Sequence, residues 1–496
     1  MNKVKSDGEK ISEALKSEDK LKSYWHILTP KGDLIDLKLV NNNVSGFDFG
    51  KYDKLRTFTQ YEMAKDRRVK STPPHVTYMR KLEIADYEEG SDPGNLRYYP
   101  NGKLIRDLIM QYDDEIMVEN GAMKIETPMM LDSNHHSLVK YMNRFPARQY
   151  IVESVKRKFF LRFASCFGQF LMMKDAVISY RNLPIWVYEL AQNCFRLENR
   201  GELSGLRRVR TFVMPDCHAF CADMEQAKTE FFKRFNISVD LMNNIGFEVK
   251  NEFEFAIRVV RSFWDENKDF IKELVKQWNK PTLIEIWDER HFYFVLKYEF
   301  NFVDVLDKAS ALTTDQIDVE NGPEFPVKFM DKDNKKKPVT ILHWSPSGAI
   351  CRVMYSLLER AAWMEKGGKL PILPFWLSPE QVRILPVADR HIVAAEKLSK
   401  KLVGVRVGID DRAEGVPKKV AKVKSDWIPY FIVVGDKEAE SGELNVFKRD
   451  DNKFEMLSIQ SFKKLLKNKQ GSMPFRKMYV PQLISKRPIF VPWGKR

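Results

Sequence analysis

Arginine is concentrated in one stretch of the chain, residues 194–221, which reads CFRLENRGELSGLRRVRTFVMPDCHAFC. Five arginines and two carboxylates surround the glycines Gly201 and Gly205, with aromatic and β-branched residues on both sides. This composition predicts two antiparallel strands joined by a long basic loop. A guanidinium held on a strand can bind a phosphate through two parallel hydrogen bonds, which makes the stretch a candidate phosphate site. A charged surface hairpin is the alternative.

Cysteine and histidine side chains form the second chemically interesting group. The run Cys-His-x-x-Cys at 217–221 could grip a metal with neighbouring residues, but successive strand residues point to opposite faces and the spacing matches no standard Cys-x-x-Cys finger. Cys166 lies among aromatic residues, where a lone cysteine is usually an inert core residue. The histidine pair at 135–136 follows a polar turn, so we expect it to be solvated.

The composition is that of a globular protein with a polyanionic partner. The 496 residues are 44% hydrophobic and 12% aromatic, which is ample for two or three domains. The formal charge of +14 favours nucleic acid, because lysines and arginines that neutralise phosphates release counterions; a basic surface kept for solubility is the alternative. Five cysteines predict no disulfide framework, and no signal peptide or membrane-spanning window is visible, so we expect a cytoplasmic protein.

The order of residues in the arginine-rich stretch resembles motif 2 of the class II aminoacyl-tRNA synthetases, which is Phe-Arg-x-Glu, a basic loop and Arg-x-Phe. The longer run GELSGLRRVRTFVMPDCHAFCAD is similar to the archaeal-type threonyl-tRNA synthetase family. The resemblance implies that Arg196 holds the α-phosphate of ATP, that Glu198 lies near the adenine, and that Phe212 stacks on it. Arg208 would meet the ATP tail, and Arg207 the acceptor stem of tRNA.

Two further segments resemble the other motifs of this class. A helical pattern over 102–120, followed by a strand ending at Pro128, resembles motif 1, which builds the dimer interface of class II enzymes. Residues 341–365 resemble motif 3, a strand followed by a helix. There Arg352 would stack on the adenine and contact the γ-phosphate, although Cys351 stands where relatives have Glu. The resemblance therefore implies a homodimer.

A zinc site is also implied by this resemblance. The family holds a catalytic zinc ion with one cysteine and two histidines, which match Cys166, His218 and His343. Three protein ligands leave a fourth position open for substrate. A zinc ion that binds the amino and hydroxyl groups of threonine would reject valine, which an apolar pocket separates from threonine by only about 100-fold. The family positions beside threonine are matched by Asp216, Gln316 and Met214.

The implied chemistry needs no side-chain nucleophile. The threonine carboxylate would attack the α-phosphate of ATP in line, and a tRNA hydroxyl would then attack the adenylate. Arg196, Arg352 and Mg²⁺ would orient the groups and neutralise charge, with Lys297 near the adenylate. Two further positions depart from the family pattern: Met214 replaces a glutamine, and Phe294 stands where relatives have a tyrosine, with Tyr293 beside it.

We predict an α+β protein: a class II catalytic domain, with an antiparallel sheet flanked by helices, and a C-terminal α/β anticodon-binding domain. The second assignment rests on a β-α-β-α-β pattern over 383–435. Residues 150–160 and 184–193 are expected to be helical. The predicted segments are a charged arm at 1–21, an accessory or linker unit at 22–95, the catalytic domain at 96–372 and the anticodon-binding domain at 373–496.

The C-terminal residues 461–496 contain ten Lys or Arg and no Asp or Glu, with aromatic residues interleaved. This pattern favours RNA, and a solvated basic tail is the alternative. Glu438 matches an anticodon contact of the family. A base-stacking arginine of the family is replaced by Phe447, with Lys448 and Arg449 beside it.

Full-length family members carry an N-terminal editing domain, and only about 95 residues precede the catalytic core here. The resemblance therefore implies an enzyme without cis-editing that relies on a separate trans-editing protein. A non-catalytic tRNA-binding paralogue is the alternative, which the departures at Cys351, Phe294 and Phe447 would favour.

Overall fold

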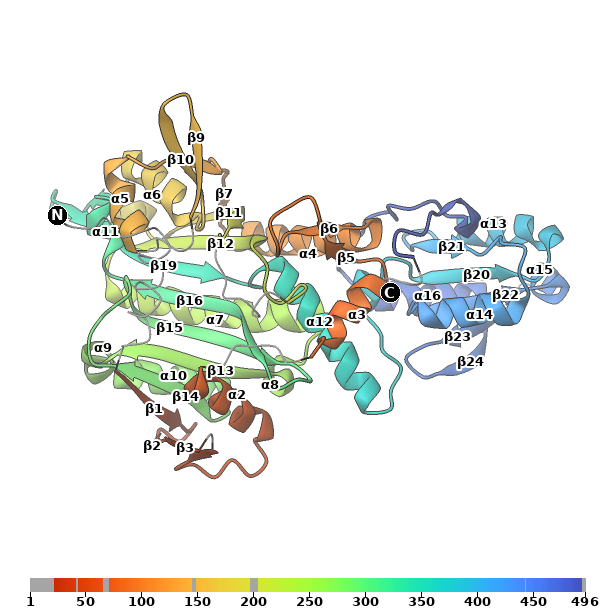
Figure 1. Ribbon diagram of the computed structural model, residues 1–496, viewed down its shortest axis with the longest axis horizontal. Helices are drawn as coiled ribbons and strands as arrows, with labels where there is room; N and C mark the ends of the chain where they lie inside the picture. The colour runs from red at the N-terminus through yellow and green to blue at the C-terminus, as the bar shows by residue number, and fades with distance from the viewer. Residues whose placement is uncertain are drawn as a thin grey trace, which may run out of the picture. The chain divides into compact units, whose positions relative to one another are not determined.

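The structure is a computed structural model that describes residues 22–41, 43–65, 71–144, 149–196, 204–441 and 443–492 (Figure 1). The predicted arm at 1–21 and Glu198 lie outside these residues. Two compact units make up the chain: the first contains the described residues before position 71 together with 113–353, and the second contains 71–112 together with 354–496. Residues of the predicted accessory unit at 22–95 are shared between the two units, and the predicted domain boundaries stay a prediction.

A mixed, mainly antiparallel sheet of ten strands forms the first unit (Figure 1). Only the pairs β13 with β14 and β11 with β7 are parallel. Strands from distant parts of the chain are neighbours, so side chains far apart in sequence can share one face. The strands in order across the sheet are β2 (Leu34–Asp36), β1 (Ser23–Leu28), β14 (Thr282–Trp287), β13 (Phe253–Val260), β15 (Phe294–Val303), β16 (Ala309–Asp318), β19 (Thr340–Ser345), β12 (Thr211–Cys221), β11 (Ile185–Cys194) and β7 (Met123–Lys124).

Helix α7 (Met224–Ile245) covers one face of this sheet and packs on β12, β16 and β19. Asp223 caps its first turn, because the carboxylate accepts the backbone N–H of Gln226 at 2.9 Å. Its buried residues recur every three or four positions and include Phe231, Phe235 and Leu241, which is the pattern of a helix with one apolar face. The candidate functional residues lie on the opposite face of the sheet.

The motif 2 prediction of two antiparallel strands is confirmed by the pairing of β11 with β12. The helical predictions for 150–160 and 184–193 are wrong. Strands β9 (Tyr150–Ser154) and β10 (Arg157–Leu161) form a hairpin, which pairs with β8 (Met130–Asp132), and 185–194 is β11. Both segments are rich in aromatic and β-branched residues, whose preference for strands outweighed the apparent helical spacing.

Helix α4 (Pro100–Glu119), which begins in the second unit and ends in the first, confirms the helix predicted at 102–120. Strand β7 of the first unit confirms that a short strand follows, although it ends at Lys124 and not at Pro128. Other elements of the first unit are α2 (Asp53–Ala64), β3 (Lys38–Val40), β4 (Asn43–Ser45), α5 (His136–Arg144), α6 (Cys166–Asp175), α8 (Val249–Glu252), α9 (Arg261–Glu266), α10 (Lys268–Trp278), α11 (Asn321–Glu324), β17 (Lys328–Met330) and β18 (Lys336–Pro338). Helix α12 (Ile350–Lys366) begins in the first unit and continues into the second.

The second unit contains a five-stranded sheet in the order β21 (Val407–Ile409), β20 (Val382–Pro386), β22 (Tyr430–Val434), β23 (Glu443–Lys448) and β24 (Lys453–Ser458). The first three strands are parallel and the last two are antiparallel additions, which confirms the predicted α/β pattern. The remaining elements are α3 (Pro74–Lys81), β5 (Ala85–Tyr87), β6 (Leu96–Tyr98), α13 (Ile392–Lys401), α14 (Val416–Ser425), α15 (Asp436–Ser441) and α16 (Ile459–Gln470).

None of the helices formed by the described residues has the length and apolar character needed to cross a membrane.

Candidate active site and metal centre

A single row of side chains crosses four neighbouring strands of the ten-stranded sheet. Lys297 of β15 pairs with Gln316 of β16, and Gln316 pairs with His343 of β19. His343 pairs in turn with His218 of β12. Directly paired residues point to the same face of a sheet. The register therefore places an amine, an amide and two imidazoles side by side.

Strand β12 adds three side chains to this face. Strand residues alternate between faces, so Phe212, Met214 and Asp216 point to the same side as His218. The two cysteines of the 217–221 run point to the side that α7 covers, and both are fully buried. That run therefore cannot close around one metal ion.

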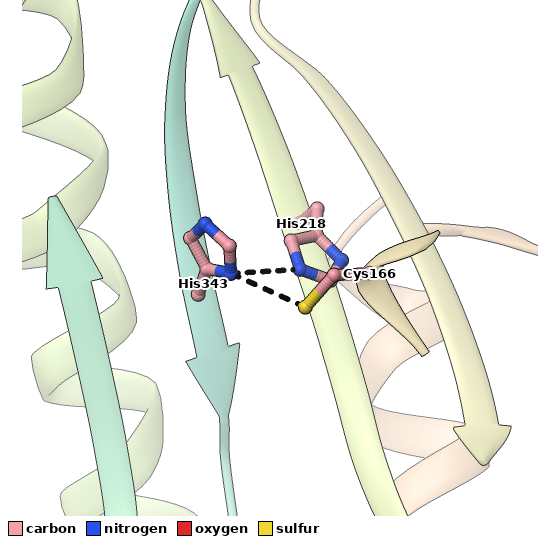
Figure 2. A group of neighbouring side chains, drawn as sticks. All are labelled: Cys166, His218 and His343. Atoms are coloured by element: carbon pink, nitrogen blue, oxygen red, sulfur yellow. Dashed lines mark hydrogen bonds between the residues drawn. The ribbon is translucent and has the colours of Figure 1, made fainter. Parts of the chain in front are cut away.

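Helix α6 begins at Cys166 and brings the thiol next to the two histidines (Figure 2). Its Sγ lies 3.5 Å from Nδ1 of His343, and Nε2 of His218 lies 3.0 Å from the same nitrogen. The three donor atoms all lie within 4.8 Å of one another. Atoms that bind one tetrahedral zinc ion lie roughly 3.3–3.7 Å apart, given bond lengths of about 2.0–2.3 Å. The cluster thus has the dimensions of a zinc site.

Each histidine ring is held by a hydrogen bond on its other nitrogen. Nδ1 of His218 donates to Oε1 of Gln169 at 2.7 Å, and Nε2 of His343 donates to Oδ2 of Asp318 at 2.7 Å. The acceptor fixes which nitrogen carries the proton. Nε2 of His218 and Nδ1 of His343 are consequently both unprotonated, and these are the two nitrogens that face each other.

Two nitrogen lone pairs at 3.0 Å repel each other unless a proton or a metal cation lies between them. Burial lowers the pKa of His218 well below its usual value, and the neighbouring His343 and Arg234 lower it further, so a shared proton is unfavourable. Burial, together with the carboxylates of Asp216 and Asp318, raises the pKa of Cys166 well above its usual value. A metal cation would instead lower the pKa of the Cys166 thiol and hold the sulfur as a thiolate. The donor set therefore fits a metal ion.

Two polar groups next to this cluster are arranged for a ligand. The carboxylate of Asp216 accepts a hydrogen bond from the hydroxyl of Ser165, the residue before α6. Burial raises the pKa of Asp216, and the Ser165 hydroxyl opposes that shift. Oε1 of Gln316 is buried and has no hydrogen-bond partner among the described residues. A buried amide oxygen without a partner is costly, and a bound ligand would satisfy it.

Tyr293 packs against the cluster. Its ring lies 4.7 Å from the ring of His343, with 30° between the planes. Phe294 is buried instead against Trp287 and Phe292. Tyr293 therefore packs on the metal cluster, and the ring of Phe294 lies beside it at 5.6 Å.

Predicted phosphate-binding residues gather where the loop between β11 and β12 meets α12. Arg196 lies two residues after the end of β11 and has an exposed side chain. Arg352, in the first turn of α12, donates from Nε to the carbonyl of Arg207 at 3.3 Å and from Nη1 to that of Ala311 at 3.1 Å. Arg208 is half-buried in the same loop. Phe212 is half-buried edge-on to Phe195, 5.0 Å between ring centres.

Arg207 does not have the exposure that the predicted acceptor-stem contact needs. Its side chain is 4% exposed and donates to the hydroxyl of Tyr61 at 2.7 Å, to Oγ of Ser310 at 3.0 Å and to the carbonyl of Ala309 at 3.0 Å. A guanidinium bound to three protein oxygens anchors the loop from below. Because the guanidinium is buried, it is not presented to RNA.

The residues predicted to contact the anticodon, in the second unit, also differ in how far they are buried. Arg449 is buried and donates to the carbonyls of Pro371 at 2.7 Å and Lys424 at 2.8 Å, so the structure does not support it as an RNA contact. Phe447 is buried as well, between two phenylalanine rings of β22 and β24. Glu438 is half-buried on α15, where it accepts the N–H of Gly435 at 2.9 Å, and Lys448 is paired with Glu455.

Three residues that shape the metal cluster were not assigned from sequence: Ser165, Gln169 and Asp318. A signal existed for two of them. Gln169 follows Cys166 by three positions in a helical segment, and Asp318 follows Gln316 by two in a strand, so each shares a face with a predicted site residue. Ser165 had no such signal, because its contact depends on how α6 lies on β12.

Known families match both units of the chain. Residues 150–361 match the class II core domain of tRNA synthetases (G, H, P, S and T), and residues 381–469 match an anticodon-binding domain. The fold is shared with the RNA binding domain of threonyl-tRNA synthetase from Cryptosporidium parvum, with a TM-score of 0.69, 22% identity and coverage of 81% of this chain and 99% of that one. The fold is also shared with a prolyl-tRNA synthetase of Giardia lamblia in complex with prolyl-adenylate, with a TM-score of 0.63, 18% identity and coverage of 78% of this chain and 73% of that one. The fold and the matched domains define a class II aminoacyl-tRNA synthetase.

Curated relatives narrow the class to one specificity. The threonine–tRNA ligase of Pyrococcus horikoshii is 52% identical over 485 residues, which are 97% of this chain and 76% of the relative. That of Methanosarcina barkeri is 49% identical over 492 residues, 98% of this chain and 76% of the relative. The chain belongs to the threonine–tRNA ligase family. Enzymes of this class use ATP with Mg²⁺.

Proposed function

We propose that this chain activates threonine with ATP, transfers it to tRNA(Thr), and selects it with a zinc ion held by Cys166, His218 and His343. The observation that carries the zinc proposal is the pair of unprotonated imidazole nitrogens 3.0 Å apart beside a thiol, each ring fixed by its own acceptor. When bound, zinc supplies a Lewis acid that can take up the amino and hydroxyl groups of threonine together. Valine has no hydroxyl to offer.

The side chains around the cluster then orient threonine. Asp216 is a carboxylate on the same face as His218, and its hydrogen bond from Ser165 leaves its second oxygen for the substrate hydroxyl. The unpartnered Oε1 of Gln316, which pairs with His343 in the same row, is an acceptor for the substrate amino group. Met214 lies two residues from Asp216 on the same face and would contact the apolar part of threonine.

For adenylate formation we propose that Arg196 binds the α-phosphate and that Arg352 and Arg208 bind the rest of the triphosphate, with Mg²⁺ neutralising its charge. Phe212 would stack on the adenine, and Glu198 belongs to the same proposed site. Such a site works by orientation and charge stabilisation and needs no covalent catalyst. The ammonium of Lys297 forms an ion pair with the carboxylate of Glu299 at 2.6 Å, which holds the lysine in place beside Gln316.

The test is ATP–pyrophosphate exchange with threonine, serine or valine, on zinc-replete and chelated protein. Threonine-dependent exchange that disappears on chelation and returns with zinc supports the proposal. Threonine-dependent exchange at the same rate with and without zinc would refute the role of the metal and would still support the ligase activity. Buried positions for all three departures, Cys351, Phe294 and Phe447, give the non-catalytic paralogue no support from the site.

A homodimer is part of the proposal. Large apolar side chains at the end of α4, in β7 and in β9 are about half exposed, and a second copy would cover them. They are Val118, Met123 and Ile151. Light scattering behind size-exclusion chromatography should give twice the mass of the 58.2 kDa chain. A monomer at micromolar concentration would refute this.

We further propose that the polypeptide of these 496 residues does not clear mischarged tRNA. Serine carries the same amino and hydroxyl groups as threonine, so the zinc site alone does not reject it. Seryl-tRNA should therefore accumulate in a purified reaction and disappear when a trans-editing protein is added. Rapid loss of seryl-tRNA in the purified reaction would contradict the proposal.

We propose that Glu438 and Lys448, which are both half-buried in the second unit, contact the tRNA anticodon. The predicted cytoplasmic location agrees with five cysteines that form no disulfide. Replacing Glu438 by Gln should raise the KM for tRNA(Thr) and leave threonine-dependent exchange unchanged. An unchanged KM would remove this residue from the interface.

A further inference from the structure

The second unit contains a cavity of about 490 Å³ that the aminoacylation site does not use. Its walls are the end of α3, the start of α4, the segment before β20, the end of α14 and the C-terminal segment 480–490. All of these belong to the second unit. Cavities that hold small molecules in proteins are about 300–1,000 Å³ and combine apolar walls with a few polar groups. This cavity has both features.

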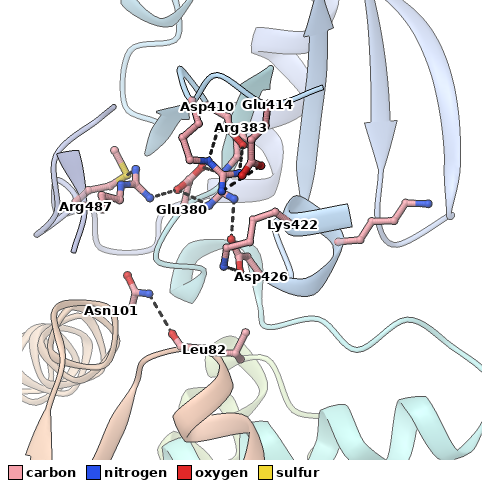
Figure 3. A network of polar contacts seen from close by, with 12 residues as sticks. Leu82, Asn101, Glu380, Arg383, Asp410, Glu414, Lys422, Asp426 and Arg487 are labelled. Atoms are coloured by element: carbon pink, nitrogen blue, oxygen red, sulfur yellow. Dashed lines mark hydrogen bonds and ion pairs between the residues drawn. The ribbon is translucent and has the colours of Figure 1, made fainter. Parts of the chain in front are cut away.

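A network of ion pairs forms the polar part of the cavity lining (Figure 3). Glu380 lies between Arg383 at 2.7 Å and Arg487 at 2.6 Å, and Arg383 also pairs with Asp426 at 2.7 Å. Lys422 completes the chain by binding Asp426. These charges satisfy one another, so they make the wall rigid and leave little capacity for a ligand.

Three charged lining residues stand outside this network. Glu83 accepts the backbone N–H groups of Phe490 and Val491, Arg412 pairs with Asp410, and the third is Lys81, at the end of α3. It is half-buried, and its ammonium has no ion pair or hydrogen bond within the described part of the chain. The lining as a whole has five basic and three acidic side chains. A half-buried cation without a counter-charge favours one anionic group in the cavity.

Aromatic side chains occupy the remaining wall. Trp427 lines the cavity with its backbone at φ +59°, a left-handed conformation that is rare for bulky residues, and its ring meets Tyr78 edge-on at 4.8 Å. Phe490 is 39% exposed, and its ring lies 5.4 Å from that of Tyr99. Its backbone N–H donates to Glu83 at 3.1 Å, which fixes the C-terminal segment as a wall. Such walls fit a flat apolar body.

We propose that this cavity binds a small aromatic molecule that carries one anionic group, with the anion on Lys81 and the ring among the apolar and aromatic side chains. The site is separate from the residues assigned to threonine, ATP and zinc. Its occupant belongs to the chemical class of aryl carboxylates and sulfonates.

The test uses the full chain and 1-anilinonaphthalene-8-sulfonate as the probe, followed by its fluorescence. We expect saturable binding of one probe per chain that ATP and threonine do not displace. Lys81→Met should weaken binding about tenfold, since one charge-assisted contact is lost. Ala413→Trp places a bulky ring at an exposed lining position and should abolish the saturable phase.

Lys463→Met, which removes an exposed lysine outside the cavity, is the matched control and should leave the affinity unchanged. Melting curves of all three variants should match that of the unchanged chain, because none of the substituted side chains is buried. The proposal is overturned by absence of saturable binding, by displacement with ATP, or by equal affinity in Lys81→Met and Lys463→Met.

Discussion

Replacing Asp318 by Asn should disable the metal site by reversing the proton position on His343. Oδ1 of Asp318 accepts the backbone N–H groups of Glu320 at 2.8 Å and Asn321 at 2.9 Å, and Oδ2 accepts Nε2–H of His343. In the variant, the amide oxygen is needed by the two backbone N–H groups, so the NH₂ group faces the imidazole. The ring must then present an unprotonated Nε2 to it and carry its proton on Nδ1, the nitrogen that faces Cys166.

Loss of a partner that orients a metal ligand typically costs 10- to 100-fold in metal affinity, which is about 1.4–2.7 kcal/mol. We expect the upper end for Asp318→Asn, because the bond is buried and involves a carboxylate, and because in the tautomer that binds zinc the amide NH₂ would face the Nε2–H donor. Gln169→Leu removes only a neutral acceptor from His218 and should cost about tenfold, the lower end.

Zinc affinity is measured by competition with a coloured chelator, and the ligand field by the visible spectrum of the cobalt-substituted protein. The matched control is Asp304→Asn, in the turn between β15 and β16, which alters a buried aspartate whose Oδ1 likewise accepts two backbone N–H groups, those of Leu306 and Lys308. Equal zinc affinity in Asp318→Asn and Asp304→Asn would refute the reasoning about the proton on His343.

Three other predictions address the metal, the sheet and the dimer. Cys166→Ser should lower bound zinc well below one per chain and abolish threonine-dependent exchange, whereas His135→Ala should leave both unchanged; normal zinc content in Cys166→Ser would remove the thiolate from the site. Burial alone would raise the pKa of Glu299, but Lys297 and Arg258 lower it to about 2, so its stabilising effect is present above about pH 4.5 and is lost as the pH falls toward 2. Glu299→Gln should therefore lower the free energy of unfolding, measured with urea, by up to about 3 kcal/mol at pH 7 and by much less at pH 3. An equal decrease at both pH values would contradict this. Met123→Glu places a charge on an exposed apolar strand and should shift the protein toward monomer in light scattering, while an undisturbed dimer would remove β7 from the interface.

Sequence alone predicted the parts of the fold that depend on local patterns. The β-α-β-α-β order of the second unit, the helix of motif 1 and the strand pair of motif 2 follow from periodicity and turn residues. The segments at 150–160 and 184–193 were misassigned because short apolar runs fit both a helix and a strand. In the first of these, the hairpin turn rests on Val155 and Lys156 with φ of +43° and +68°, a conformation that these residue types do not signal.

The residues of the metal cluster could be proposed from sequence only through resemblance, because their proximity is set by strand pairing. Nothing in the spacing of Cys166, His218 and His343 shows that β19 lies between β12 and β16. The burial of Arg207 and Arg449 could not be predicted from the sequence either. An arginine in a basic run looks available for RNA until its carbonyl partners are known.

The row across the sheet depends on two irregularities in the pairing of β15 with β16. Between Phe294 and Leu296 one extra residue lies on β15, and between Glu299 and Asn301 one extra residue lies on β16. The two shifts cancel, so only the segment around Lys297 is displaced by one position relative to the rest of the pair. Without the displacement, Lys297 would no longer pair with Gln316, because a slip of one residue moves side chains to the other face. The bulges therefore bring the lysine into the row with the metal cluster.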